Sequence, residues 1–437
     1  MVKLHLWVFI ILIYLLEFGY GDVIEVPPLN INQKDLMKHL SIVDIKIALP
    51  AIYVFDDSFV DNGNNKAILG NKDAIGGGYL PFGIDFDGKP TGRVTNGRIG
   101  IDFIATVAGL PYPPPIEKTI RTGVNYASGA SRLLPQNGHF LHKYVINFFQ
   151  QVDLFENSTM EDLKSTFDSP EGFIQYLSKS LFFIHHAGND LGLTFEAEME
   201  KKYSIDKYAE LLIEEFSKQL KRLYTLGARK FFVSNVSPLG CSPFNINTKN
   251  HSGPCVEEIN NRVSVYNNLL PGLWAKLQST LPGSNFVLGD IYKVFQDVFE
   301  MPRSYGFKDV NTSCCVDNNG TRIQVCAPNI APCKDRKNRV FFDPFHLSET
   351  MHFLWARRFL KDSSRKLGRG GFKKISRGNM TQKWACLSGL EEPLRASACD
   401  TTSRVQGPRF EQRGKQIKEF YFAARSKRGG RQWGTKG

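Results

Sequence analysis

The 437-residue sequence lacks several patterns that would place it in a common functional class. It has no internal repeat. It also has no Gly-x-Ser-x-Gly sequence, which argues against an ordinary α/β-hydrolase lipase. After residue 21 no segment is apolar enough to span a bilayer, so we expect no stable membrane insertion.

The sequence also has little excess charge outside its C-terminal end. The net charge is +12, but from residue 365 onward Lys and Arg exceed Asp and Glu by about 13. The rest of the chain is therefore close to neutral, and we expect no nucleic-acid partner. Residues 363–437 lose apolar periodicity and are predicted to form a basic, disordered tail. The alternative is a polybasic arm that binds an acidic cell-wall polymer or a lipid head group.

The N-terminus predicts export from the cell. Residues 1–21 contain Lys3, an apolar run over residues 6–16, and small residues at Gly19 and Gly21, which is typical of a cleaved signal peptide. A membrane anchor is the alternative, but the run is shorter than the roughly 20 residues that span a bilayer. We expect a secreted protein of the extracellular space or cell wall.

The cysteine content fits an oxidising compartment, in which cysteines pair as disulfides. The eight residues are Cys241, Cys255, Cys314, Cys315, Cys326, Cys333, Cys386 and Cys399. A zinc site is the competing interpretation, but adjacent cysteines lack the Cys-x-x-Cys spacing that lets two thiolates hold one metal. The sequence alone does not fix which cysteines pair.

Four short apolar runs read as buried strands, at residues 51–55, 181–184, 230–233 and 285–288. Each run ends in polar or small residues. Amphipathic patterns over 206–226 and 257–281 predict helices between them. Apolar strands that alternate with such helices indicate an α/β fold with a parallel sheet covered on both faces. Functional sites in such folds form at the carboxyl ends of the strands.

Polar residues in these positions could support hydrolysis by a serine. Ser58 follows the first strand, and Asp343 lies three residues before His346, close enough for its carboxylate to reach the imidazole. Asn189 follows the second strand and offers a side-chain amide to an oxyanion. Gly129 offers an unobstructed backbone N–H.

Longer blocks around these residues resemble the plant GDSL esterase/lipase family, within the SGNH hydrolase superfamily. The resemblance covers about residues 48–362. The matching blocks are 54–65 (VFDDSFVDNGNN), 81–86 (PFGIDF), 92–98 (GRVTNGR), 125–129 (NYASG), 188–190 (GND), 238–241 (PLGC) and 343–346 (DPFH).

The resemblance implies a flavodoxin-like three-layer α/β/α fold that needs no metal or organic cofactor. It implies that Ser58 is the nucleophile, His346 the general base and Asp343 its orienting partner. The Ser58 N–H, Gly129 and Asn189 would form the oxyanion hole. The same resemblance divides the chain into an N-terminal linker (22–47), a hydrolase domain (48–362) and the tail.

One residue departs from the family pattern, and two other features suggest a different kind of site. Asp56 stands where the family has Gly, which adds a carboxylate two residues before the nucleophile. His185 and His186 continue an apolar run, which favours interior histidines over metal ligands. Residues 83–89 resemble a phosphate-binding loop, but Pro90 replaces the Ser or Thr that would hold Mg²⁺, so no nucleotide cofactor is expected.

These observations lead to the hypothesis of a secreted serine esterase or lipase that acts on a small-molecule, lipid or cell-wall carboxylic ester. Two alternatives stay open. An acyltransferase would use the same residues with an alcohol in place of water. A noncatalytic binding protein would keep the fold if Asp56 disturbed the nucleophile loop.

Overall fold

A computed structural model describes residues 24–42, 48–65, 77–118, 121–134, 145–315, 326–328 and 330–367. The signal peptide expected over 1–21 lies outside the described residues. So does the basic tail after residue 367, together with Cys386 and Cys399.

A five-stranded parallel sheet forms the centre of the molecule, with the strand order β2-β1-β3-β4-β5. Its strands are β1 (Ile52–Phe55), β2 (Gly123–Asn125), β3 (Leu181–His185), β4 (Lys230–Ser234) and β5 (Asn285–Gly289). Four of them are the runs predicted from the sequence. The order is that of flavodoxin-like folds. A second, two-stranded sheet pairs β6 (Asp309–Ser313) with β7 (Arg339–Phe341).

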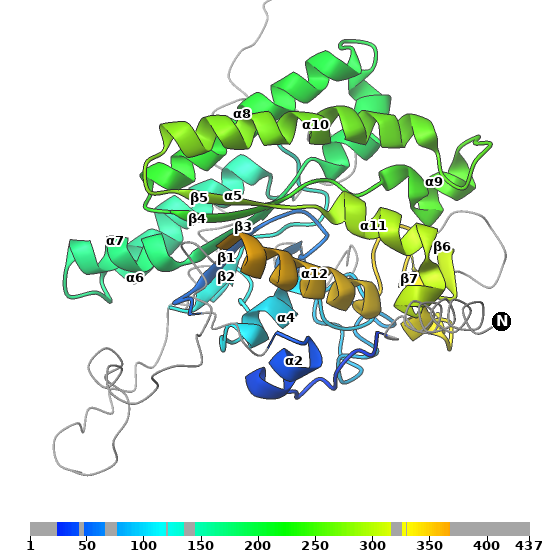
Figure 1. The fold of residues 1–437 in the computed structure, drawn as a ribbon, viewed down its shortest axis with the longest axis horizontal. Coiled ribbons are helices and arrows are strands. Elements are labelled where there is room, and N and C mark those ends of the chain that lie inside the picture. The colour runs from blue at the N-terminus through cyan, green and yellow to red at the C-terminus, as the bar shows by residue number, and fades with distance from the viewer. Residues whose placement is uncertain are drawn as a thin grey trace, which may run out of the picture.

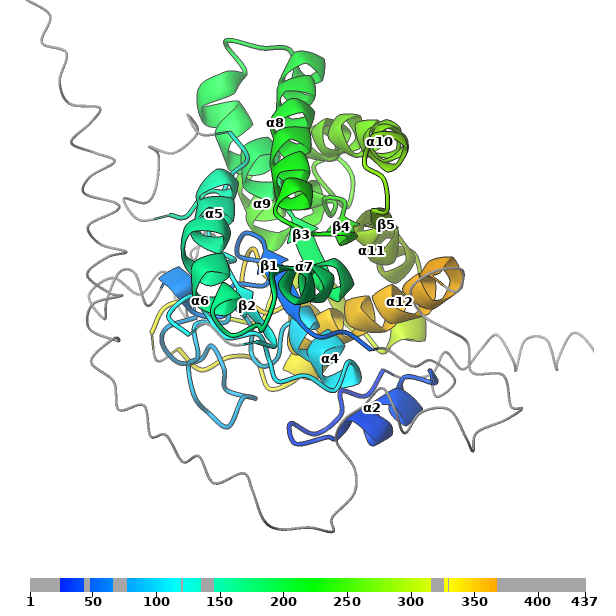
Figure 2. The ribbon, with the colours of Figure 1, turned by 90° about the vertical axis from the view of Figure 1, so that its left-hand side faces the viewer.

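Helices cover both faces of the central sheet, which confirms the three-layer α/β/α prediction. Side chains alternate along β1: Tyr53 and Phe55 face one core, and Ile52 and Val54 face the other. Figures 1 and 2 show α8 and α10 on one side of the sheet and α4 and α12 on the other. The α-helices in the described residues are α2 (Gln33–His39), α4 (Gly100–Val107), α5 (Phe148–Leu154), α6 (Met160–Lys164), α7 (Pro170–Lys179), α8 (Ile205–Thr225), α9 (Pro243–Thr248), α10 (Glu257–Thr280), α11 (Ile291–Glu300) and α12 (Glu349–Leu367). The 3₁₀ and π helices in these residues are η2 (Phe155–Thr159), η3 (Asp190–Met199), η4 (Leu239–Cys241), η5 (Pro302–Tyr305) and η6 (Arg336–Asn338).

Helix α8 illustrates how the sequence determines a covering helix. The Ser204 side chain accepts the N–H of Lys207 and caps the first turn. Its apolar residues recur every three or four positions, and they are buried against the sheet and α10. Each such side chain contributes roughly 1.5–3 kcal/mol when fully buried. Gly227, with φ of 112°, ends the helix in a conformation that other residues avoid.

Part of the stretch expected to be a linker is folded. Helix α2 begins after Asn32, whose side chain accepts the N–H of Asp35, and it buries Leu36 completely. Leu40 and Ile42 are buried in the same core as α4 and α12. At the other end α12 continues to Leu367, beyond the expected domain boundary at residue 362.

Two buried ion pairs stabilise the layer that contains α4 and α12. Arg93 forms two hydrogen bonds of 2.8 Å with Asp102 in the first turn of α4. Glu349, the first residue of α12, accepts the backbone N–H of Arg98 at 3.1 Å and its Nε at 2.7 Å. The second pair ties the start of α12, and the segment before it, to the loop that precedes α4.

Disulfides join the six cysteines in the described part of the chain, as predicted. The pairs are Cys241–Cys255, Cys314–Cys333 and Cys315–Cys326. The N–H of Cys314 donates to Phe341 O at 3.3 Å and that of Cys315 to Phe342 O at 2.7 Å, so the last two disulfides adjoin the two residues before Asp343.

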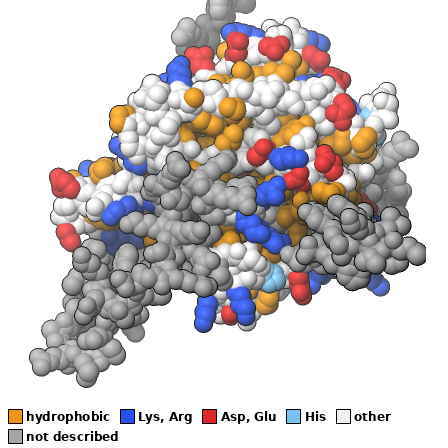
Figure 3. Space-filling view, in the orientation of Figure 1, with side chains coloured by type: hydrophobic (Ala, Val, Ile, Leu, Met, Phe, Trp, Pro, Cys, Tyr) orange, Lys and Arg blue, Asp and Glu red, His pale blue; other side chains and the backbone are white. Residues whose placement is uncertain are grey.

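Acidic and basic side chains are interspersed on the face of the molecule seen in Figure 3. This mixture agrees with a nearly neutral body. No helix among the described residues combines the length and apolar character needed to cross a bilayer.

Candidate active site

The sheet brings Ser58 and Asn189 together. Ser58 lies three residues after the end of β1, and Asn189 four residues after the end of the neighbouring β3. The strand order reverses at this place, because β2 lies on one side of β1 and β3 on the other. Crevices at such points are where open α/β sheets bind ligands.

Ser58, His346 and Asp343 form a continuous hydrogen-bonded chain. His346 Nε2 lies 2.9 Å from Ser58 Oγ, and His346 Nδ1 lies 2.7 Å from Asp343 Oδ2. Asp343 Oδ1 accepts two backbone N–H groups, from Phe345 at 2.8 Å and from His346 at 2.6 Å. The carboxylate is thus fixed in the orientation that receives Nδ1–H and leaves Nε2 as an acceptor for the serine proton.

The surroundings of His346 favour its protonated form. Burial alone would lower the pKa of His346, but the charge and hydrogen bond of Asp343 raise it above the usual 6.5. The charges of Asp57 and Asp61 act in the same direction. About a fifth of the His346 side chain is exposed (21%), so the ring is accessible to solvent.

Asn189 and Gly129, the expected oxyanion donors, both have partners in the structure. The Asn189 amide Nδ2 lies 3.2 Å from Asp57 Oδ2 and 3.1 Å from the carbonyl of Ser131. The N–H of Gly129 donates to Asp61 Oδ2 at 2.9 Å, so it is not free. Catalytic hydrogen bonds often rearrange only when substrate binds.

A buried glutamine that the sequence did not reveal holds the loop that carries Ser58. Gln151 on α5 accepts the N–H of Asp56 at 3.0 Å and donates to the Asp56 carbonyl at 2.8 Å. It also donates to Ser131 Oγ at 3.1 Å. A lone Gln in an amphipathic helix carries no motif, and only the packing of α5 against β1 identifies its role.

Asp56, the residue that departs from the family, is completely buried and points away from solvent. Its Oδ1 lies 3.1 Å from His185 Nδ1. His185 and His186 are both buried, as predicted, and His186 packs on Phe148 with 4.5 Å between ring centroids. Burial lowers the pKa of both histidines.

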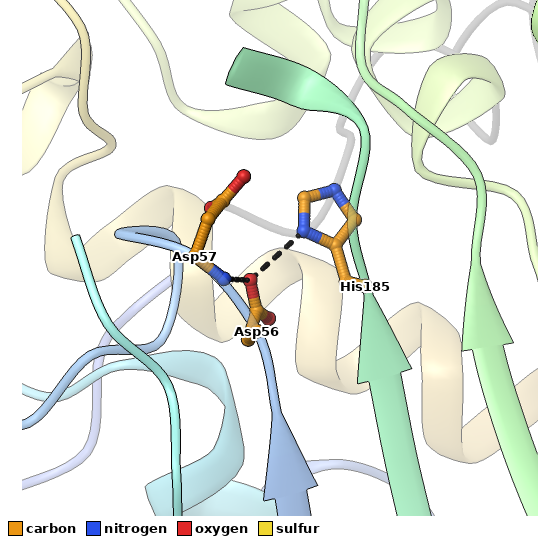
Figure 4. Close-up of side chains that lie close together, drawn as sticks. All are labelled: Asp56, Asp57 and His185. Carbon is orange, nitrogen blue, oxygen red and sulfur yellow. Dashed lines mark hydrogen bonds and ion pairs between the residues drawn. The ribbon is translucent and has the colours of Figure 1, made fainter. Parts of the chain in front are cut away.

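Asp56, Asp57 and His185 each offer one ligand atom, and these atoms lie within 4.8 Å of one another (Figure 4). Within the described residues this group is the one that could hold a metal ion. Its donors already bond to one another and to the backbone.

A family model described as GDSL-like Lipase/Acylhydrolase matches residues 52–359. The chain belongs to the GDSL esterase/lipase family. GDSL esterase/lipase 7 of Arabidopsis thaliana is 38% identical over 72% of this chain and 88% of its own length. A second GDSL esterase/lipase of the same plant is 34% identical over 71% of this chain and 81% of its own.

Membership of the GDSL family makes the protein a carboxylic ester hydrolase. Among solved structures, a phospholipase A1 from Streptomyces albidoflavus NA297 matches with 11% identity and a TM-score of 0.33, covering 72% of this chain and 100% of that one. A likeness of this degree says nothing about which ester this GDSL enzyme cleaves.

Proposed function

We propose that the protein is a secreted serine esterase that cleaves esters through an acyl intermediate on Ser58. The observation that carries the proposal is the hydrogen-bonded chain from Ser58 through His346 to Asp343, at 2.9 and 2.7 Å. A serine hydroxyl is a weak nucleophile until an adjacent base takes its proton. His346 Nε2 is within reach to do so.

In the first half of the reaction Ser58 Oγ attacks the ester carbonyl carbon, and its proton passes to His346 Nε2. Asp343 stabilises the imidazolium that forms. The oxyanion receives the Ser58 backbone N–H and the N–H of the Asn189 amide that leaves the Ser131 carbonyl, while the other N–H stays on Asp57. The Gly129 N–H joins them when it leaves Asp61. His346 then protonates the leaving alcohol.

In the second half water attacks the acyl group on Ser58. His346 Nε2 takes a proton from that water, and the collapse of the second tetrahedral intermediate releases the acid and returns the proton to Ser58. A substrate alcohol in place of water would give acyl transfer with the same residues. Product analysis with an added alcohol separates the two outcomes.

The substrate class is a small-molecule, lipid or cell-wall carboxylic ester. Phe345, beside His346, is 38% exposed and packs on Phe244 of α9 with 4.5 Å between ring centroids. This pair offers an apolar surface to the part of the ester nearest the base.

The first experiment compares hydrolysis of p-nitrophenyl acetate, butyrate and octanoate by the purified protein and its Ser58→Ala variant. Labelling with a fluorophosphonate probe accompanies it. We expect the variant to lose both hydrolysis and labelling while it stays folded. A folded wild-type protein that neither hydrolyses these esters nor takes up the probe would contradict the serine mechanism and favour a binding role.

Secretion has its own test. The three disulfides suit an oxidising compartment. Mass spectrometry of protein recovered from the medium of expressing plant cells should find an N-terminus at Asp22. Retention in the cells with Met1 intact would refute the predicted export.

A further inference from the structure

A buried cluster of ionisable side chains lies directly behind the nucleophile. Asp56 is 0% exposed, and Asp57 and His185 are each 5% exposed. Asp56 Oδ1 lies 3.1 Å from His185 Nδ1 and accepts the backbone N–H of Asp57 at 2.5 Å (Figure 4). Asp56 therefore ties the end of β3 to the backbone of the loop that carries Ser58.

The contacts continue from Asp57 to the oxyanion donor. Asp57 Oδ1 accepts the N–H of Phe59 at 2.9 Å, and its Oδ2 accepts the amide of Asn189 at 3.2 Å. The space around this carboxylate is narrow, because a Cβ atom on Gly188 would lie 3.2 Å from Oδ2. The Asp57 carboxylate thus helps to determine where the Asn189 amide lies, together with the Ser131 carbonyl at 3.1 Å.

His185 also touches the residue on the other side of the nucleophile. Its ring packs on Phe59 with 5.0 Å between centroids, and Phe59 packs on Trp355 of α12 at 5.3 Å. The same side chain therefore contacts the loop two residues before Ser58 and one residue after it.

We propose that Asp56 and His185 are positioning residues for the oxyanion hole. His185 Nδ1–H holds the Asp56 carboxylate, Asp56 holds the main chain at Asp57, and the Asp57 carboxylate holds the Asn189 amide. The proposal rests on the serine mechanism proposed above, because it concerns where the oxyanion donor lies during that reaction. Neither Asp56 nor His185 needs to touch the substrate.

The ionisation of the cluster should make the hold of Asp57 on the Asn189 amide depend on pH. Two neighbouring buried carboxylates are costly to ionise together, so burial and the charge of Asp56 raise the pKa of Asp57 to about 7. Burial raises the pKa of Asp56 as well, and its proton belongs to the cluster rather than to one residue. A carboxylate accepts the Asn189 amide more strongly than a carboxylic acid does, so the amide is best held above about pH 7.

The other ionisable groups that act on the cluster come from three segments. The Asp61 charge raises the pKa of Asp56 from the same loop. His186 lies beside His185 at the end of β3, and burial keeps it neutral. His346 interacts with Asp57 from the segment before α12.

The test replaces His185 in two ways and His186 in one. His185→Phe keeps a ring against Phe59 but removes the donor to Asp56, and we expect kcat to fall about 10-fold to 100-fold with KM changed less than about threefold. His185→Asn places an amide N–H near the position of Nδ1 and should recover most of kcat. His186→Phe, at the buried position directly after β3, is the matched control and should stay within about twofold of wild type.

A double variant separates positioning from general destabilisation. If His185 acts through Asn189, His185→Phe should lower kcat less than about threefold further once Asn189→Ala is present. A full additional drop in that background would overturn the proposal. So would an unchanged kcat in His185→Phe, or failure of His185→Asn to recover activity. If His185→Phe does not fold, the comparison of His185→Asn with His186→Phe still decides, because the proposal requires both to be active.

Two further measurements separate this proposal from the serine mechanism and from binding of a metal ion. Loss of activity in Ser58→Ala tests the serine mechanism independently of any change at His185. Dialysis against EDTA tests whether the cluster holds a metal ion instead. We expect unchanged activity, and a loss that added Zn²⁺ or Mn²⁺ restores would overturn the positioning role.

Discussion

Replacement of Asp343 by Asn should convert His346 into a poor base by reversing its tautomer. An Asn side chain at this position can lie in two orientations. With its oxygen at Oδ1 it keeps both backbone N–H bonds, from Phe345 and His346, and turns its NH₂ toward Nδ1. His346 must then accept at Nδ1 and carry its proton on Nε2, which faces Ser58 and cannot take the serine proton.

The opposite orientation would restore the correct tautomer but places an NH₂ group against two backbone N–H donors. Each bond lost there costs about 1–3 kcal/mol, so this orientation lies roughly 2–6 kcal/mol higher. The productive fraction is then about 1 in 30 to about 1 in 20,000, and we expect kcat to fall by that range.

The assay is steady-state hydrolysis of p-nitrophenyl butyrate at pH 8, with circular dichroism to confirm folding. Asp335→Asn is the matched control, because that carboxylate pairs with Arg339 at 3.1 Å with 44% of its side chain exposed, and such pairs contribute little. A folded Asp343→Asn variant whose kcat stays within tenfold of wild type would refute the orienting role.

Three other perturbations test separate parts of the structure. Asn189→Ala should lower kcat about 100-fold to 1,000-fold with little change in KM, as measured with p-nitrophenyl acetate; a drop smaller than about fivefold would exclude it from the oxyanion hole. Because Asp343 raises the pKa of His346 and only neutral His346 can act as base, kcat/KM should fall as the pH decreases, with a midpoint above 6.5. A value of kcat/KM that does not change between pH 5 and pH 8 would contradict this. Asp102→Ala leaves the buried Arg93 guanidinium unpaired and should lower the free energy of unfolding by about 3–5 kcal/mol in urea titrations; a loss under 1 kcal/mol would show that Arg93 finds another partner.

The strands β1, β3 and β4 could be predicted because each is an apolar run buried inside a parallel sheet. β5 is a similar apolar run, although it lies at the sheet edge and is only partly buried. β2 could not be predicted, since Gly123–Asn125 contains one β-branched residue and is defined by its pairing with β1. Helix α2 had a readable signal, with Asn32 as its cap and Leu36 and Leu40 four residues apart, but seven residues form too short a pattern to separate from a polar linker.

The site was predictable to different degrees. Asp343 and His346 are three residues apart, so their contact follows from local geometry, whereas the contact of His346 with Ser58 spans 288 positions. Only the order of the family's sequence blocks predicted that the three would meet. Nothing in the sequence indicated that Asp61 would occupy the Gly129 N–H, because that bond depends on how the loop after β1 folds back.

The disulfides beside Asp343 have a consequence for how the enzyme is produced. Cys314 and Cys315 bond to the carbonyls of Phe341 and Phe342, so the crosslinks at these two cysteines support the backbone immediately before Asp343. A chain synthesised in a reducing cytosol has every residue of the site but not this support. Its specific activity should therefore decrease as the number of free thiols in the preparation increases. The activity of this protein should be measured on material from an expression host that oxidises cysteines.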